Sequence, residues 1–153
     1  MTVLTTDGWR MQWHRVERGF AKLSETYNNT ELYDDDIYHF FQDAWHLKDW
    51  IKNDPEVPSA VSAQVEREVN DVRAFRVAAD FANGTKHMTL NRPREEHAKF
   101  TERKVTIMLG GPGRAVQERV LTLTDGSQTT AEAVAADVMR EWNLLLRRFG
   151  LVT

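Results

Sequence analysis

Hydrophobic side chains recur at helical spacing over four stretches of this chain. Those of the first stretch follow one another at spacings of 4, 3, 4, 3 and 4, which place them on one face of a helix. They are Trp9, Trp13, Val16, Phe20, Leu23 and Tyr27. A second helix is expected over residues 31–53, a third from about residue 58 to residue 83 or 87, and the last over residues 129–149. Asp54-Pro55 ends the second helix, because proline forces the residue before it out of helical geometry.

The period changes from helical to alternating between the third and the last helix. Residues 105–109 alternate in polarity, a second β-prone run covers residues 116–124, and three glycines and a proline lie between them at 110–113. A short further strand is expected over residues 88–91. Thr129 and Glu132 have the spacing of a capping box that begins the last helix. The sequence therefore predicts one mainly α (α+β) domain over residues 1–153, an antiparallel four-helix bundle with a β-hairpin inserted at about 98–124.

Composition limits the classes of function. The chain has 153 residues, no cysteine and a net charge of −3, so disulfides and thiolate chemistry are excluded. No apolar run of about 18 residues and no signal peptide are visible, so a cytoplasmic protein without a membrane partner is expected. Residues 31–56 hold eight acids against two lysines, whereas residues 92–119 hold seven basic residues against four acids. The basic residues of the hairpin region either protect exposed strand edges or meet phosphates.

Polar and aromatic side chains share one face of the second helix. His39, Asp43, His46 and Trp50 follow one another at spacings of 4, 3 and 4. Imidazole and carboxylate suit metal binding and proton transfer, but the same pattern also fits a helix whose polar groups pair with its neighbours. Neither His-Glu-x-x-His nor Glu-x-x-His occurs, so no metal and no cofactor are predicted.

The third helix has a matching stripe of polar side chains at spacings of 3, 4, 3 and 4. Its members are Arg73, Arg76, Asp80, Asn83 and His87, with Lys86 beside the last of them. Guanidinium groups with a histidine and a carboxylate are able to bind phosphate and move a proton. The alternative is a solvated face whose charges pair with the acids of the second helix.

If the helices are straight and antiparallel, each residue lies about 1.5 Å further along the axis from the turn than the one before it. Residues at equal distances from the turn are expected to lie side by side. These positions predict two clusters, one of Asp36, His39, Arg73 and Arg76 and one of His14, Asp43 and His46. His46 and His87 are separated axially by roughly 30 Å on this reasoning. These two histidines would therefore meet only across a second chain, which would be a homodimer.

Two segments carry a resemblance to a known group of proteins. Trp-His-Leu-Lys-Asp-Trp-Ile at 45–51 and Asp-Phe-Ala-Asn-Gly-Thr-Lys-His at 80–87 resemble small prokaryotic and phage proteins of the HEPN-like helical group. The resemblance implies a compact, dimeric helical domain, in a group where many members are RNA-cutting toxins or defence proteins. That group's motif is an arginine followed by four to six residues and then a histidine, whereas positions 80–82, which the arginine would occupy ahead of His87, are Asp, Phe and Ala.

The resemblance therefore implies binding of RNA or a nucleotide and leaves cleavage open. The candidate catalytic residues are His46, Asp80 and His87, of which His46 and Asp80 would transfer protons and His87 would contact phosphate. The candidate binding residues are Arg73, Arg76, Asn83, Lys86, His39 and Trp50. The competing hypothesis is a non-catalytic homodimeric interaction module, or one that sequesters a small ligand.

Overall fold

The computed structural model describes residues 8–24, 30–86, 99–107, 115–123 and 125–153. For 30–32, 84–86, 99–107 and 115–118 it describes the backbone and not the side chains. The strand expected over 88–91, the glycine-rich turn at 110–113 and His87 lie outside the described residues. The mainly α fold with a hairpin before the last helix is confirmed. Within the described ranges, no helix combines the length and the apolar character needed to cross a bilayer.

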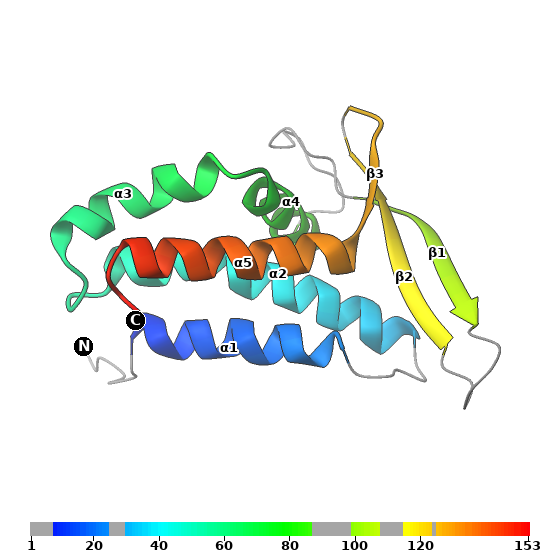
Figure 1. Cartoon of the computed structure of the whole chain (residues 1–153), viewed down its shortest axis with the longest axis horizontal. Coiled ribbons are helices and arrows are strands. Elements are labelled where there is room, and N and C mark those ends of the chain that lie inside the picture. Colours follow the sequence, from blue (N-terminus) through cyan, green and yellow to red (C-terminus); the bar gives the residue numbers. More distant parts are fainter. Residues whose placement is uncertain (1–7, 25–29, 87–98, 108–114, 124) are drawn as a thin grey trace.

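Helix α2 organises the fold. The helices are α1 (Trp9–Lys22), α2 (Thr30–Asn53), α3 (Ser59–Asn70), α4 (Arg73–Lys86) and α5 (Ala131–Arg148). Helix α2 contacts each of the other four. Helices α1, α2 and α5 run along the long axis of the molecule, α3 lies over one end of α5, and the strands lie at the opposite end (Figure 1). The start of α1 and the C-terminus lie at the end away from the strands (Figure 1).

The stretch predicted as one long third helix consists of two helices. Helix α3 ends at Asn70, and Asp71 caps it in a helical conformation before α4 begins at Arg73. Short polar side chains such as Asn and Asp favour turns over helix interiors, and the valines before them have low helix propensity. The break sets α4 at a large angle to α3 (Figure 1), so heights calculated for a straight rod do not hold beyond residue 70.

The sheet has three antiparallel strands in the order β1-β2-β3. Strands β1 (Lys99–Ile107) and β2 (Ala115–Thr122) form the predicted hairpin, with a register shift between Phe100 and Glu102. Strand β3 (Gln128–Thr130) was not predicted as a strand; it pairs with β2 and leads directly into α5. This pairing fixes one end of the hairpin to the N-terminus of α5.

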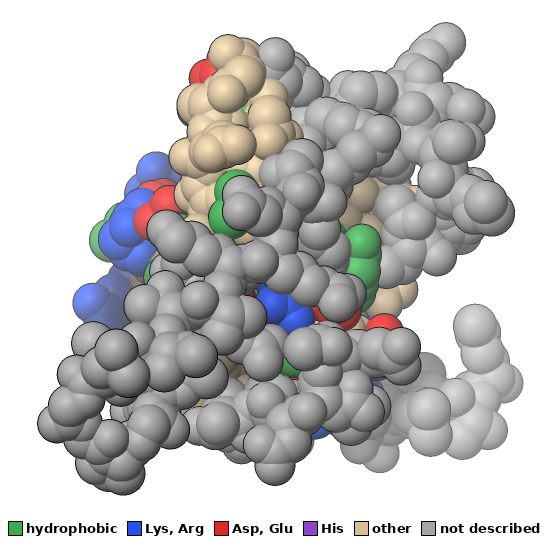
Figure 2. Space-filling model, turned by 90° about the vertical axis from the view of Figure 1, so that its right-hand side faces the viewer, with side chains coloured by type: hydrophobic (Ala, Val, Ile, Leu, Met, Phe, Trp, Pro, Cys, Tyr) green, Lys and Arg blue, Asp and Glu red, His purple; other side chains and the backbone are tan. Residues whose placement is uncertain are grey.

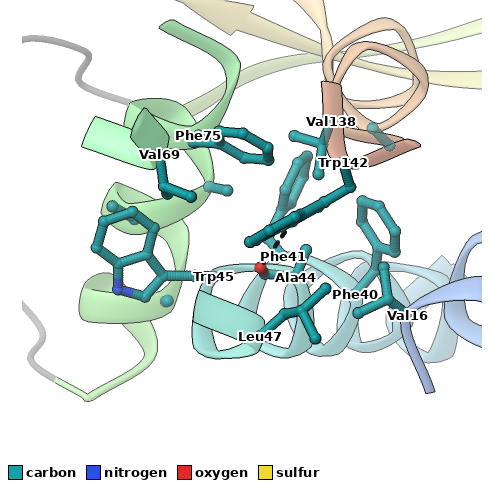
Figure 3. Close-up of a cluster of buried hydrophobic side chains, with 14 of the residues drawn as sticks. Val16, Phe40, Phe41, Ala44, Trp45, Leu47, Val69, Phe75, Val138 and Trp142 are labelled. Atoms are coloured by element: carbon teal, nitrogen blue, oxygen red, sulfur yellow. Dashed lines mark hydrogen bonds between the residues drawn. The ribbon is translucent and has the colours of Figure 1, made fainter. Parts of the chain in front are cut away.

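The centre of the core lies between α2, α4 and α5, where Trp142 is the central side chain (Figure 3), and buried side chains of α1 and α3 extend it. Trp142 is fully buried, packs against Phe75 with ring centroids 4.9 Å apart, and donates its indole N–H to the carbonyl oxygen of Ala44 at 3.0 Å. Phe41 stacks on Phe81 of α4 with centroids 4.5 Å apart. A buried indole needs a hydrogen-bond partner, so this bond also sets the position of α5 on α2.

The N-termini of α5 and α1 are held by contacts other than the predicted capping box. Thr130, not Thr129, caps α5, and its hydroxyl accepts the N–H of Ala133 at 3.1 Å. Glu132 is thereby available for contacts with α2 and β2. At the start of α1, Asp54 accepts the N–H of Trp9 at 2.9 Å, which ties α1 to the loop after α2.

Candidate functional site

A groove of about 510 Å³ runs between α1 and α2, and ionisable side chains of both helices line it. Helix α1 contributes cations and helix α2 contributes two carboxylates and an imidazole. The six side chains are Arg15, Arg18 and Lys22 from α1, and Asp36, His39 and Asp43 from α2. Both sets have spacings of 3 and 4, so each forms a stripe along its helix.

Gly19 and Phe40 form the floor of this groove. A Cβ built at Gly19 would lie 3.6–3.7 Å from atoms of Phe40, so the glycine brings the two helices to van der Waals contact. The ring of Phe40 is fully buried and lies 5.8 Å from that of Phe20, measured between centroids. The apolar floor keeps the polar side chains at the rim of the groove.

Both ends of the groove are closed by polar pairs between the helices. At one end, Nζ of Lys22 lies 3.5 Å from Oδ1 of Asp36. At the other end, the buried amide of Gln12 donates to the carbonyl oxygen of Asp43 at 2.9 Å and to its Oδ1 at 3.2 Å. Arg15 donates to the oxygen of the same Gln12 amide at 3.0 Å. The charges of both carboxylates are thus partly satisfied within the protein.

Arg18 and His39 lie between these two ends. Both side chains are exposed, and within the described part of the chain neither makes a hydrogen bond or an ion pair. A guanidinium and an imidazole on the rim of one groove are a pair of donors for an anion. This is the part of the groove best suited to a phosphate group.

Trp50 continues the same face of α2 beyond the groove. Its ring is half-buried, and the guanidinium carbon of Arg15 lies 5.6 Å from the ring centroid. Arg15 therefore contacts both Trp50 and the Gln12 amide. An aromatic surface with an arginine over it is available at this end of the site.

A buried polar network lies at the other end of α2, where that helix meets β2 and α5. Nε of Arg119 donates to Oδ1 of Asp34 at 2.5 Å, and its guanidinium carbon lies 5.0 Å from the ring centroid of Tyr33. Glu132 accepts the hydroxyl of Tyr33 at 2.6 Å and the N–H of Arg119 at 3.2 Å. Burial, and then the Asp34 carboxylate, raise the pKa of nearby Tyr38.

Arg119 is 1% exposed, so the expectation that it is an exposed strand cation is wrong. Acidic and basic side chains lie side by side near the centre of this end of the molecule (Figure 2). Since every polar group of the network has a partner inside the protein, we assign the network to joining the hairpin to the bundle rather than to chemistry.

The predicted cluster of Asp36, His39, Arg73 and Arg76 does not form. Asp36 and His39 face α1, whereas Arg73 pairs with Asp125 at 3.1 Å and Arg76 donates to the carbonyl oxygen of Asn70 at 3.2 Å. The break between α3 and α4 is the physical reason, because it turns the arginines away from the acids of α2. Arg73 instead lines a smaller groove of about 290 Å³ between α4, β3 and α5.

The predicted cluster of His14, Asp43 and His46 does not form either. His14 is exposed and pairs with Glu17 of its own helix at 2.9 Å, while Gln12 takes the place beside Asp43. His46 is exposed on α2. The height calculation placed His14 at the correct level along α1 but did not fix which side of that helix faces α2.

The remaining candidates are scattered. Asp80 is 1% exposed within the core, Asn83 is half-buried on α4, and the side chain of Lys86 is outside the described part. Among the described residues, no group of three or more His, Asp or Glu side chains is placed to hold a metal ion. The sequence interpretation missed Arg15, Arg18 and Lys22, although their spacings of 3 and 4 mirror those of Asp36, His39 and Asp43.

Comparison of the chain with protein-family models, curated proteins and solved structures found no match.

Proposed function

We propose that this chain is a helical domain, of the HEPN-like kind that its sequence resembles, that binds RNA or a nucleotide through the α1–α2 groove. The observation that carries the proposal is the position of Arg18 and His39. They lie exposed between two ends at which the other charges already have partners. A phosphate bound there gains charge-assisted hydrogen bonds without breaking an existing ion pair.

The charge of the groove supports an anionic ligand. Three cations and two carboxylates line the groove, and the His39 imidazole adds a further hydrogen-bond donor. Helix α2 has a net negative charge because of its acidic residues. The basic residues of α1 are therefore what makes the groove attractive to an anion. The site is open and shallow, which suits binding of a flexible chain or a small ligand.

Catalysis is not part of the proposal. A general base must lie within hydrogen-bond reach of the reacting group, and neither His46 nor Asp80 lines the groove. Asp80 lies within the core, and His46 is exposed and lies outside the set of side chains that line the groove. The domain is therefore proposed to bind its ligand rather than to turn it over.

Titration calorimetry with a short RNA and with a nucleoside triphosphate tests the proposal. Arg18→Gln and His39→Gln are each expected to weaken binding about tenfold, the effect of losing one charge-assisted hydrogen bond. Arg147→Gln is the matched control, because Arg147 is an exposed arginine of α5 that does not line the groove. Equal affinities for all four proteins, or no binding to the parent protein, would overturn the proposal.

Light scattering on the same samples tests the homodimer that the sequence suggested. The chain has a mass of 17.7 kDa, so a dimer is expected at about twice that value. A dimer would give the exposed His46 a partner from a second chain.

A further inference from the structure

We infer that the ligand is single-stranded RNA, held with a phosphate between Arg18 and His39 and with an unpaired base against Trp50. This inference rests on the proposed function and narrows its ligand class. Trp50 lies on the same face of α2 as His39 and Asp43, at spacings of 4 and 7 from them. Arg15, which lines the groove, also lies over the Trp50 ring and so links the groove to the tryptophan.

Trp50 differs from the other tryptophans in exposure. The chain has five, and four of them are at most 6% exposed and belong to the core: Trp9, Trp13, Trp45 and Trp142. Trp50 is half-buried and carries the guanidinium of Arg15 at 5.6 Å from its ring centroid. Aromatic rings and arginine planes are the groups on which proteins stack unpaired bases, and stacking tolerates any base.

The distance along α2 from His39 to Trp50 favours an oligonucleotide over a single nucleotide. His39 and Trp50 are eleven residues apart, which is roughly 16 Å along a helix axis. A nucleoside monophosphate is too short to contact both ends at once, whereas an oligonucleotide spans them. In a duplex the faces of each base are covered by the neighbouring base pairs, so stacking on Trp50 requires a single strand.

The carboxylates of the groove favour ribose over deoxyribose. Asp36 and Asp43 repel phosphates, but a carboxylate is a strong acceptor for a ribose 2′-hydroxyl. Asp43 lies between His39 and Trp50 in the sequence of α2, so a sugar that joins the bound phosphate to the stacked base passes beside it. Deoxyribose lacks that hydroxyl, while the repulsion between the carboxylates and the phosphates is the same. DNA of the same sequence should therefore bind more weakly.

Fluorescence anisotropy with a labelled five-nucleotide RNA tests this inference. Trp50→Leu is expected to weaken RNA binding about tenfold, whereas Trp50→Phe keeps a ring and should retain most of the affinity. Intrinsic fluorescence gives a second readout, because the four core tryptophans are shielded and quenching by the bound base is expected at Trp50. The far-ultraviolet circular dichroism of both variants confirms that they are folded.

The outcomes separate this inference from the proposed function. If RNA binds through Arg18 and His39 but Trp50→Leu changes neither affinity nor quenching, the stacking assignment is wrong and the phosphate site stands. If DNA of the same sequence, or the nucleoside monophosphate, binds as tightly as the RNA, the choice of single-stranded RNA is wrong. If none of these ligands binds, both proposals fail together.

Discussion

Arg119 of β2 and Asp34 of α2 form an ion pair of 2.5 Å in which the arginine is only 1% exposed. Arg119→Met is expected to lower the free energy of unfolding by about 3 kcal/mol, because it leaves the Asp34 carboxylate without its buried counter-charge. Urea denaturation followed by circular dichroism measures this. Replacing both residues, as Arg119→Met with Asp34→Leu, should recover part of the loss, since no uncompensated charge remains.

An exposed arginine pair serves as the control for that prediction. Arg140 lies 2.6 Å from Asp137 on α5, but both side chains are about half exposed. Arg140→Met should change stability far less than Arg119→Met, because water screens the exposed pair. Similar losses for the two variants would show that burial is not what gives the Arg119 pair its strength.

Of the glycines in the described part of the chain, Gly8 has the least room for a side chain. It has a φ of +56°, and an added Cβ would overlap the Oδ2 atom of Asp54, the oxygen that accepts the N–H of Trp9. Gly8→Ala should therefore lower the melting temperature by breaking this contact as well as by straining the backbone. Gly150→Ala is the matched control, because Gly150 has a φ of +68° with nothing within 4 Å of the added Cβ.

The difference between these two glycine variants isolates the contact with Asp54. Differential scanning calorimetry should show a clearly larger loss for Gly8→Ala than for Gly150→Ala, which has only the backbone cost of about 1–2 kcal/mol. Asp54→Ala removes the oxygen and should make the added cost of Gly8→Ala resemble that of Gly150→Ala. Equal losses in the parent background would contradict the role given to Asp54.

The contribution of the Asp125 carboxylate to the free energy of unfolding depends on pH. Its carboxylate accepts the hydroxyl of Ser127 at 2.5 Å and the N–H of Ser127 at 2.9 Å, and it pairs with Arg73; these contacts lower the pKa of Asp125 to about 2. A carboxylate whose pKa is lower in the folded state stabilises the fold above its unfolded pKa, near 4. That contribution is lost as the pH falls toward 2.

Asp125→Asn should therefore be less stable than the parent protein at pH 7, with the difference shrinking between about pH 4 and pH 2. Urea denaturation at a series of pH values measures the difference. Ser127→Ala removes the largest cause of the low pKa, so in that background the difference at pH 7 should be smaller and its loss should be complete at a higher pH. A difference independent of pH would contradict the assignment.

The sequence predicted the helices, the hairpin and the apolar faces because each leaves a local periodic pattern. The apolar positions of α1 and α5, such as Val16 and Trp142, are buried as the spacing indicated. The break at Asp71 was missed, because the valines of α3 continue in phase into α4 and periodicity alone does not show a bend.

The candidate site was harder to predict because it depends on which sides of two helices face each other. His39 and Asp43 were identified from their spacing, and both line the groove. The partners of His39 were sought on the third helix and that of Asp43 at His14 of the first, whereas Arg18 of α1 lines the groove with both. The position of a residue along a helix follows from its number, but the rotation of the helix is set by packing such as that of Gly19 on Phe40.

The most direct test of the central claim is to map the binding site by nuclear magnetic resonance. A ¹⁵N-labelled protein titrated with the five-nucleotide RNA should show amide shifts over residues 15–22 of α1 and 36–50 of α2, where the groove and Trp50 lie. Shifts confined instead to the groove around Arg73, between α4, β3 and α5, would contradict the account. So would a spectrum that RNA leaves unchanged.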